Sequence, residues 1–373
     1  MPAINLLIKP ASGNCNMQCK YCFYADEIKN REISSYGIMT QETLEIIIKK
    51  TLEYTTTDCS IAFQGGEPTL VGLNFYKKLL DITNQYKKPN TNVSFSIQTN
   101  GYIIDDEWAK FFADNKFLVG ISLDGNKAIH DRYRVDKRGE GTFSKVINAI
   151  GLFDKHKVEY NVLTVVNGPS SYKARKIYNY FTKLGINYQQ YIECLDPFNE
   201  TAKHEYSLTP EEYSTFLKDM FDMWYIDMKN NKYIYNRYFE NLMMIIAGYE
   251  PESCNMRGIC GKQWVVEADG SVFPCDFYVL DKWKLGNFTT DSIEDMDKVR
   301  FENKFIEESM YVCEECKQCE YNRYCRNGCK RLCEPTRNGQ RQRNYYCESY
   351  KSFFEYALPR LKELYVKYSL SKE

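Results

Sequence analysis

CNMQCKYCFY, residues 15–24, places three cysteines in C-x3-C-x2-C spacing shortly after an apolar segment, INLLIKP, at residues 4–10. Protein sites built from cysteine usually use four thiolates, whether they hold zinc or an iron–sulfur cluster. Three thiolates leave one metal position without a protein ligand, and a small molecule can bind there. The stretch therefore predicts a metal or cluster site that also takes a small-molecule ligand; a zinc site completed by a distant residue is the alternative.

The composition of the whole chain indicates an intracellular protein that holds metal. Its 373 residues are 43% apolar, enough for a large core, and the formal net charge of -1 argues against a dedicated nucleic-acid surface. The chain has no apolar run of about 18 residues that would span a membrane, and its first residues lack the features of a secretory signal. The 15 cysteines are an odd number, and in a reducing compartment they favour ligation over disulfides. We expect a cytoplasmic protein with neither a nucleic-acid nor a membrane partner.

Six segments with strand character alternate with amphipathic helical segments through the first half of the chain. Repeated strand–helix units predict a parallel sheet with right-handed crossovers, either doubly wound or closed into a partial barrel. From about residue 210 the alternation stops, and QWVVEADGSVFPCD, residues 263–276, predicts a hairpin that turns at Asp269–Gly270. The strand candidates are INLLIKP (4–10), SIAFQGGEP (60–68), VSFSIQTNG (93–101), FLVGISLDG (117–125), YNVLTVVNG (160–168) and NYQQYIECLDP (187–197).

Unusual short motifs stand where these predicted strands end. GGEP closes the second strand, QTNG the third, SLDG the fourth and CLDP the sixth, and the cysteine loop follows the first. Parallel α/β folds place their functional sites at the carboxyl ends of the strands. A single GGEP could be an ordinary turn, but the shared position of the five segments predicts one site at this edge of the sheet.

CNMQCKYC resembles the cysteine signature of the radical S-adenosylmethionine superfamily, and the resemblance covers the whole chain. It implies a partial (β/α)6 TIM-like barrel in which Cys15, Cys19 and Cys22 ligate a [4Fe–4S] cluster. S-adenosylmethionine would chelate the open iron, and GGEP resembles the motif that meets its amino group. The contacts to S-adenosylmethionine that the resemblance implies are Tyr21, Gly66, Ser122, Arg134 and Leu195.

Ten more cysteines lie between Cys254 and Cys347. The pattern C-x2-C-x5-C-x3-C fits from Cys316, whereas a start at Cys313 would need a cysteine where Asn322 stands. This pattern resembles the SPASM domain, which carries two auxiliary [4Fe–4S] clusters; a pair of zinc sites is the alternative. The resemblance implies one cluster on Cys254, Cys260, Cys275 and Cys329, and another on Cys316, Cys319, Cys325 and Cys347. It also implies two domains: a radical SAM partial barrel at residues 1–234 and a SPASM domain with a C-terminal helix at residues 235–373.

LLIKPASGNCNMQCKYCFY and DGSVFPCDFYVLDKW resemble stretches of anaerobic sulfatase-maturating enzymes, which oxidise an active-site Cys or Ser of a sulfatase to Cα-formylglycine. Only 14 residues precede Cys15, so we do not expect the leader-recognition domain of many peptide maturases. The resemblance implies that a 5′-deoxyadenosyl radical takes a hydrogen from the substrate Cβ, that Asp276 accepts the substrate proton, and that auxiliary clusters take an electron. Tyr24 is a further candidate for catalysis, and Gln64 is a candidate for substrate contact.

The implied cofactors are three [4Fe–4S] clusters and S-adenosylmethionine. The implied partners are an unfolded or nascent sulfatase peptide that contains C/S-x-P/A-x-R, and an electron donor such as flavodoxin or ferredoxin. Two other functions remain open: a radical peptide maturase that forms a thioether or carbon–carbon link, and a non-enzymatic iron–sulfur electron carrier. The sequence does not decide between Cys and Ser as the substrate residue.

Several residues have no ligand role in this scheme. Cys59 lies in an apolar strand and is expected in the core, and Cys194 is expected to line the site. Cys313 and Cys333 stay unassigned. The histidines, expected at exposed loop or helix positions, are His130, His156 and His204.

Overall fold

Two groups of chain segments pack separately in the computed structural model, which describes residues 3–198, 202–334 and 342–370. The first unit holds the cysteine loop and the hairpin that precedes Asp276, and the second unit holds most of the C-terminal cysteines. The sequence-based domain boundary near residue 234 stays a prediction. The first unit is Met1–Leu123, His130–Tyr160 and Lys262–Phe305, and the second is Asp124–Ile129, Asn161–Gly261 and Ile306–Glu373.

The first unit is built on a sheet with β1 near its middle. β1 pairs in parallel with β2 on one side and with β8 on the other, and β3 and β4 continue the parallel sheet beyond β2. β9 and β10 extend it in antiparallel fashion beyond β8. In sheet order the strands are β10 (Gly286–Asn287), β9 (Ser271–Phe273), β8 (Trp264–Val266), β1 (Ile4–Ile8), β2 (Asp58–Phe63), β3 (Asn92–Thr99) and β4 (Leu118–Ser122).

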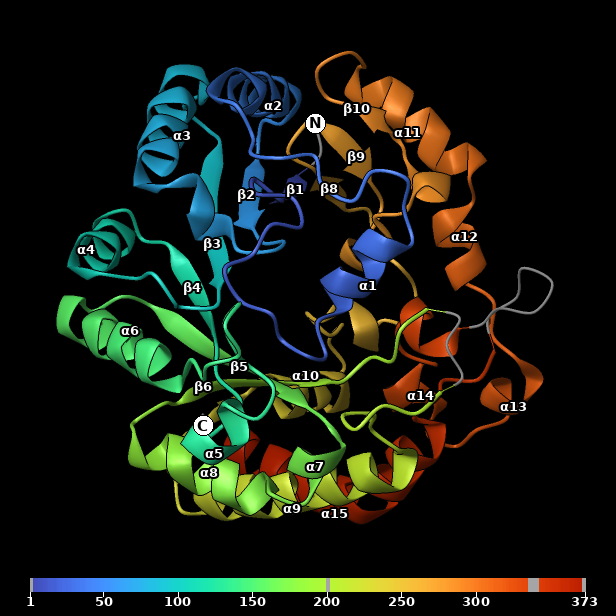
Figure 1. Ribbon diagram of the computed structural model, residues 1–373. Helices are drawn as coiled ribbons and strands as arrows, with labels where there is room; N and C mark the ends of the chain where they lie inside the picture. The colour runs from blue at the N-terminus through green and yellow to red at the C-terminus, as the bar shows by residue number, and fades with distance from the viewer. Residues whose placement is uncertain (1–2, 199–201, 335–341, 371–373) are drawn as a thin grey trace. The chain divides into compact units, whose positions relative to one another are not determined.

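Helices α2, α3, α4 and α6 cover the outer side of these strands, and α1 lies on the other side (Figure 1). Apolar residues three and four apart give each outer helix a buried face; on α2 this face includes Leu44, Ile48 and Leu52. The Thr40 side chain accepts a hydrogen bond from the Thr43 N–H and caps the start of α2. The helices of this unit are α1 (Phe23–Lys29), α2 (Gln41–Tyr54), α3 (Leu73–Tyr86), α4 (Asp106–Asp114), α6 (Phe143–His156) and α11 (Ile293–Glu302).

The second unit combines short parallel strands with long helices. β5 (Tyr160–Val166), whose first residue belongs to the first unit, pairs in parallel with β6 (Tyr188–Glu193), and β6 pairs in parallel with β7 (Tyr235–Asn236). Helices α9 and α15 pack together, with 5.8 Å between the ring centroids of Phe221 and Phe353. The larger helices are α8 (Ala174–Lys183), α9 (Pro210–Lys229), α10 (Arg237–Ile246) and α15 (Cys347–Leu370), and the short ones are α7 (Gly168–Ser171), α13 (Glu314–Lys317) and α14 (Asn322–Cys325); α5 (Lys127–His130) and α12 (Phe305–Ser309) each contain residues of both units.

The structure confirms the six predicted strands and the hairpin, whose strands β8 and β9 are antiparallel. Two features are not predicted from the sequence: helix α1 directly after the cysteine loop, and the parallel pairing of β8 with β1. The expectation for the histidines is wrong. His130 is fully buried and lies 3.0 Å from Thr142 Oγ1, while His156 and His204 are half-buried.

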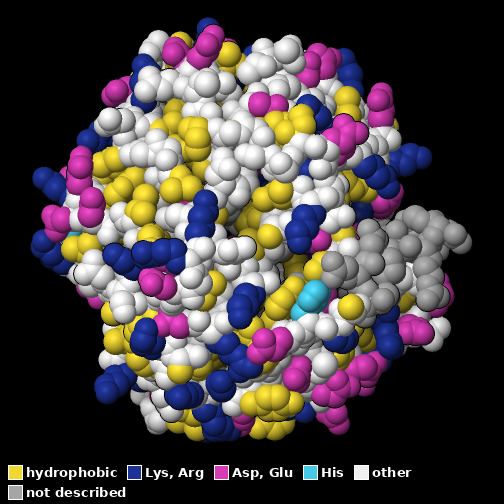
Figure 2. All heavy atoms as spheres, viewed as in Figure 1, with side chains coloured by type: hydrophobic (Ala, Val, Ile, Leu, Met, Phe, Trp, Pro, Cys, Tyr) yellow, Lys and Arg dark blue, Asp and Glu magenta, His cyan; other side chains and the backbone are white. Residues whose placement is uncertain are grey.

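The molecular surface carries both signs of charge. On the face shown in Figure 2, lysine and arginine side chains are interspersed with acidic ones, in agreement with the net charge of -1. Among the residues that the structure describes, no helix combines the length and the apolar character needed to cross a membrane.

Candidate active site and cluster sites

The cysteine loop joins β1 to α1 and is half-buried. Cys15, Cys19 and Cys22 are each partly exposed, and Cys22 is the N-cap residue of α1. Burial raises the pKa of Cys15 to about 11 and also raises the pKa of Cys22, so neither thiol ionises readily by itself. A metal centre supplies the positive charge that deprotonates such thiols. Three of them in one loop therefore fit a cluster that keeps one iron open.

The GGEP motif holds this loop through backbone contacts. The Gly66 N–H donates to Ser12 O at 2.8 Å, and the Glu67 N–H donates to Asn14 O at 2.8 Å. A Cβ atom on Gly66 would lie 2.0 Å from Asn14 O, so the close approach requires glycine. Because the Gly66 amide is engaged by the loop, its carbonyl is the backbone group suited to accept from an amine.

The buried Glu67 carboxylate ties GGEP to QTNG. It accepts hydrogen bonds of 2.6–3.0 Å from the Thr69 amide and hydroxyl, the Thr99 hydroxyl and the Asn100 amide. The Asn100 side chain in turn lies 3.6 Å from Cys15 Sγ as a donor. Two of the strand-end motifs found in the sequence are therefore joined to the cysteine loop, with a satisfied buried carboxylate between them.

Two of the predicted cofactor contacts lie beside Cys22. The Arg134 guanidinium is 5.5 Å from the centroid of the Tyr21 ring, and its positive charge opposes the rise in the pKa of Cys22 that burial causes. Ser122 is the last residue of β4. Leu195 follows β6 in the second unit. The roles of these residues toward a cofactor stay predictions.

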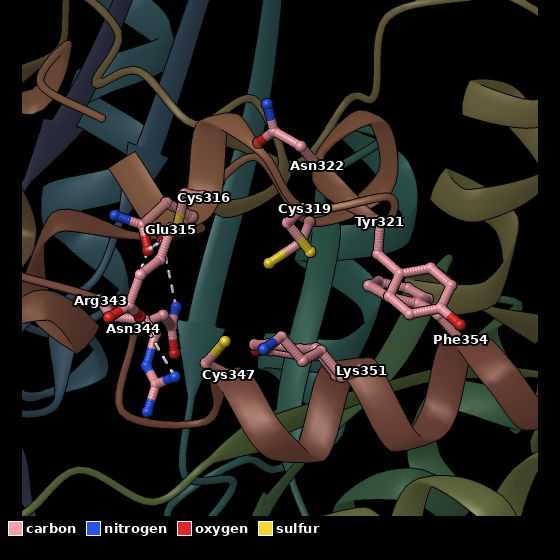
Figure 3. A pocket seen from close by; sticks show the side chains of 13 residues that line it. Glu315, Cys316, Cys319, Tyr321, Asn322, Arg343, Asn344, Cys347, Lys351 and Phe354 are labelled. Atoms are coloured by element: carbon pink, nitrogen blue, oxygen red, sulfur yellow. Dashed lines mark hydrogen bonds and ion pairs between the residues drawn. The ribbon is translucent and has the colours of Figure 1, made fainter. Parts of the chain in front are cut away.

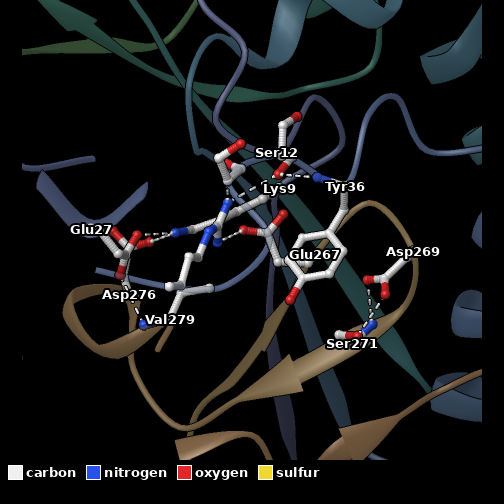
Figure 4. A network of polar contacts seen from close by, with 12 residues as sticks. Lys9, Ser12, Glu27, Tyr36, Glu267, Asp269, Ser271, Asp276 and Val279 are labelled. Carbon is white, nitrogen blue, oxygen red and sulfur yellow. Dashed lines mark hydrogen bonds and ion pairs between the residues drawn. The ribbon is translucent and has the colours of Figure 1, made fainter. Parts of the chain in front are cut away.

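Asp276 follows β9 and is a central member of the network of polar contacts shown in Figure 4. Its Oδ2 accepts from the Tyr24 hydroxyl at 2.7 Å and from Gln64 Nε2 at 3.0 Å, while its buried Oδ1 lies 3.2 Å from Lys9 Nζ. The side chain is 15% exposed. Oδ1 is thus turned inward, and Oδ2 faces Tyr24 and Gln64. The structure thus brings together the three residues predicted for catalysis and substrate contact, and it adds Lys9.

Lys9 is a buried lysine between two carboxylates. Its Nζ lies 3.1 Å from Glu27 Oε2 and 3.2 Å from Asp276 Oδ1, and 4.3 Å from the centroid of the Tyr24 ring. Burial by itself would lower the pKa of Lys9, but Glu27, Asp276 and Glu267 together raise it to about 12. Lys9 is therefore charged, and removing one member of such a buried pair typically costs about 3–5 kcal/mol.

Glu27 and Tyr24 complete the electrostatics of the network. Burial raises the pKa of Glu27 to about 7, against the opposing effect of Lys9. Burial and the Asp276 carboxylate raise the pKa of Tyr24 well above its usual value, so the hydroxyl stays protonated and donates. Glu27 Oε1 also accepts from the Val279 N–H at 2.8 Å, which fastens α1 to the segment after Asp276.

The network follows from three neighbouring strand ends. Gln64 follows β2, Lys9 follows β1 and Glu267 follows β8, and these strands are parallel neighbours. The Lys9 N–H donates to Val266 O at 2.8 Å, and Glu267 forms a buried ion pair of 2.7 Å with Arg31. The sequence could have pointed to Lys9 and Glu267 by the same strand-end rule, because each is a charged residue directly after an apolar strand.

Four cysteines of the second unit line a hollow of about 410 Å³ that is partly open to solvent (Figure 3). Arg343 and Lys351 also line it, and their charges oppose the rise in the pKa of Cys347 that burial causes. Within the described residues, no three His, Cys, Asp or Glu side chains converge as a single metal ion requires. Four thiols with Arg343 and Lys351 in one hollow, which Glu315 also lines, fit an anionic thiolate cluster. The four cysteines are those predicted for the second auxiliary cluster: Cys316, Cys319, Cys325 and Cys347.

The other predicted auxiliary set is divided between the two units. Burial raises the pKa of Cys329, and Cys254 and Cys260 nearby raise it further. These three thiols belong to the second unit, whereas Cys275 belongs to the first and directly precedes Asp276. The participation of Cys275 in this ligand set stays a prediction.

The unassigned cysteines are mostly buried. Cys59 is packed in β2, as predicted, and burial raises its pKa to about 12. Cys194 is also buried. Cys333 Sγ lies 3.4 Å from two backbone carbonyl oxygens, those of Asn327 and Cys329. Such contacts are typical of a packed, protonated thiol.

Two models of known protein families match segments of this chain. Residues 10–179 match the model of the Radical SAM superfamily, and residues 254–320 match the SPASM model, described as an iron–sulfur cluster-binding domain. The fold and the site therefore define a radical SAM enzyme with an additional iron–sulfur domain. These domains indicate iron–sulfur clusters and S-adenosylmethionine as cofactors.

Relatives that match over nearly their full length show which family of radical SAM enzymes this chain belongs to. The chain is 48% identical over 362 residues, 97% of its own length and 98% of the relative's, to a cysteine-type anaerobic sulfatase-maturating enzyme of Clostridium perfringens. It is 30% identical to a serine-type enzyme of Bacteroides thetaiotaomicron, over 95% of this chain and 89% of the other. A solved structure of native anSMEcpe with bound AdoMet and Cp18Cys peptide matches with a TM-score of 0.94 and 46% identity, over 98% of this chain and 99% of the other. The chain belongs to the family of anaerobic sulfatase-maturating enzymes.

These matches confirm the resemblance, the fold class with its parallel-stranded sheet and SPASM domain, and the assignment as a radical SAM enzyme. The number of clusters and the roles of individual residues stay predictions.

Gly66→Ala is expected to displace the cysteine loop, because the added methyl group would lie 2.0 Å from Asn14 O. The variant should lose about four irons per chain and form no 5′-deoxyadenosine, while the auxiliary clusters remain. Iron analysis and chromatography of the nucleoside products measure both effects. Gly151→Ala is the matched control, since a Cβ there meets no atom within 4 Å apart from its own helix backbone and chain neighbours. A Gly66→Ala protein with full iron content and normal cofactor cleavage would contradict this account of the motif.

Anaerobic reconstitution is expected to give about twelve irons per chain, four for each of three clusters. Replacing Cys316, Cys319 and Cys325 with Ala should remove about four of them. Replacing the packed Cys59 with Ala should remove none. Stoichiometric zinc together with only about four irons would show that the cysteine-rich region binds zinc instead.

Proposed function

We propose that this enzyme oxidises an active-site cysteine of a sulfatase to Cα-formylglycine. The observation that carries the proposal is the Asp276 carboxylate, held by Tyr24, Gln64 and Lys9 beside the cysteine loop within one unit. Support also comes from the relative of 48% identity, which is named a cysteine-type sulfatase-maturating enzyme, and from the matched structure with a bound peptide. Identity to the serine-type relative is only 30%, which favours Cys over Ser as the substrate residue.

The cofactors of the proposal are S-adenosylmethionine and three [4Fe–4S] clusters. When bound, they supply a 5′-deoxyadenosyl radical that takes a hydrogen atom from the substrate Cβ, and an acceptor for one electron. The ligands would be Cys15, Cys19 and Cys22 for the first cluster. S-adenosylmethionine would be contacted by Gly66, Tyr21, Ser122, Arg134 and Leu195. The ligands of one auxiliary cluster would be Cys254, Cys260, Cys275 and Cys329, and those of the other Cys316, Cys319, Cys325 and Cys347.

The reaction removes one hydrogen atom, one proton and one electron from the cysteine side chain. Loss of the Cβ hydrogen atom, the thiol proton and the electron converts the Cβ–S single bond to a C=S double bond. Water then replaces sulfur, which leaves as hydrogen sulfide, and the aldehyde of formylglycine remains. The protein has to accept the proton near the place where the electron leaves.

Asp276 is the proposed proton acceptor. Its Oδ2 is oriented by the Tyr24 hydroxyl and Gln64 Nε2, and Oδ1 is turned inward to Lys9. Asp276 also follows Cys275, a proposed cluster ligand, so proton and electron would leave the substrate on the same side. A positioned general base of this kind contributes roughly 10²–10⁴-fold to a rate.

The proposed partners are a peptide and an electron donor. The peptide is an unfolded or nascent sulfatase segment that contains C/S-x-P/A-x-R, and its support is the peptide present in the matched structure. Cleavage of S-adenosylmethionine needs one electron per event, which a flavodoxin or a ferredoxin would deliver.

Conversion of a C-x-P-x-R peptide tests the function directly. Under anaerobic conditions with reductant, we expect the wild-type enzyme to form the aldehyde and one 5′-deoxyadenosine per product, and to convert a Ser peptide more slowly. A variant with Cys15, Cys19 and Cys22 replaced by Ala should form neither product, because the cluster that the radical chemistry needs is absent. Mass spectrometry of peptide and nucleoside measures both. Release of 5′-deoxyadenosine without an aldehyde, or with a thioether, would mean another peptide reaction.

Asp276→Asn keeps the shape of the side chain but cannot accept the proton. We expect it to cleave S-adenosylmethionine and to take a deuterium from a Cβ-deuterated peptide into 5′-deoxyadenosine, with formylglycine reduced by roughly 10²-fold or more. Conversion at a near wild-type rate would exclude Asp276 as the base. Loss of cofactor cleavage as well would assign the residue a structural role.

A further inference from the structure

Lys9 is a charged member of the Asp276 network to which the proposed mechanism assigns no separate effect on the reaction. Its side chain is 1% exposed, and it contacts Asp276 on one side and Glu27 on the other, at 3.2 and 3.1 Å. Figure 4 shows its amino group pointing toward these two carboxylates. A lysine is rarely buried unless it is paired, so its position calls for a reason.

Lys9 is shared between two carboxylates. One ammonium group faces the carboxylates of Glu27 and Asp276, and the adjacent Glu267 is already paired with Arg31 at 2.7 Å. Among these contacts Lys9 is the cation that both carboxylates share. It therefore ties Asp276 to Glu27, and through Glu27 to helix α1.

Lys9 also decides how the Asp276 carboxylate is turned. Oδ1 is buried against Lys9, and this orientation leaves Oδ2 with Tyr24 and Gln64. Without the ammonium group, no cation among these contacts would hold Oδ1 inward. The carboxylate could then rotate away from Tyr24 and Gln64.

We propose that Lys9 is a positioning residue for formylglycine formation: shared between Glu27 and Asp276, it holds Oδ1 of the proposed proton acceptor inward and so keeps Oδ2 with Tyr24 and Gln64. The proposal rests on the proposed function. It assigns Lys9 an effect on the step after hydrogen abstraction, and not on cofactor cleavage.

Lys9→Met tests the proposal, because methionine has a similar length and no charge. The readout is the ratio of formylglycine to deuterated 5′-deoxyadenosine, measured by mass spectrometry with a Cβ-deuterated C-x-P-x-R peptide. We expect this ratio to fall about tenfold or more, as expected for an impaired general base, with iron content and deuterium transfer retained. A merely structural defect would lower deuterium transfer and product together and leave the ratio unchanged.

Glu27→Gln and the double variant separate the two carboxylates. Glutamine keeps the acceptor for the Val279 N–H, and Lys9 then pairs with Asp276 alone. We expect Glu27→Gln to lower the ratio less than Lys9→Met does. In Lys9→Met/Glu27→Gln no charge is left unpaired on Glu27. If Lys9 served only to neutralise Glu27, the double variant would recover the wild-type ratio; the proposal expects the ratio to stay low.

Lys77→Met is the matched control, since Lys77 forms an ion pair with Glu107 on the surface, where both side chains are exposed. It should leave the ratio unchanged. A Lys9→Met enzyme with the wild-type ratio would overturn the proposal while leaving the proposed function intact. Absence of formylglycine from the wild-type enzyme, in contrast, would overturn the proposed function itself, so the two failures are distinguishable.

Discussion

The parallel pairing of β8 with β1 is the constraint on which the candidate active site depends. It aligns Ile8 with Val266, so that Lys9 and Glu267, the next residues of the two strands, lie at the same edge of the sheet. β9 then returns antiparallel to β8, and the chain leaves it toward Asp276. Because side chains alternate between the faces of a strand, a shift of one residue in this pairing would turn the charged side chains away from one another.

Buried charge is what joins the cysteine loop to the hairpin within the first unit. Arg31 and Glu267 form one buried pair, and Lys9 is shared between Glu27 and Asp276. An unpaired charge in such surroundings would cost several kcal/mol, so these groups keep their geometry together. The consequence for chemistry is that Asp276, the proposed proton acceptor, is fixed relative to the cysteine loop, where radical formation is expected.

Much of this arrangement can be predicted from sequence because parallel strands place their ends together. That rule brings the cysteine loop, GGEP and QTNG to one edge, and resemblance to a family points to Asp276, Tyr24 and Gln64. The pairing of β8 with β1 cannot be predicted in this way. The two strands of a hairpin pair because they are close in sequence, whereas β1 and β8 lie some 250 residues apart and are brought together by packing. Helix α1 has only seven residues, too few for a clear apolar period. The strand-end rule marks Lys9 as a candidate, but its burial between two carboxylates cannot be predicted without the pairing of β8 and the fold of α1.

The stoichiometry of hydrogen transfer in the wild-type enzyme tests the account most directly. A C-x-P-x-R peptide with both Cβ hydrogens of the target cysteine replaced by deuterium is converted under anaerobic conditions, and the deuterium in 5′-deoxyadenosine is counted against formylglycine by mass spectrometry. The account predicts one deuterium transferred for each formylglycine formed, because abstraction from Cβ is coupled to proton loss at Asp276. Formylglycine produced without deuterium in 5′-deoxyadenosine, or deuterium transfer that yields no formylglycine, would contradict it.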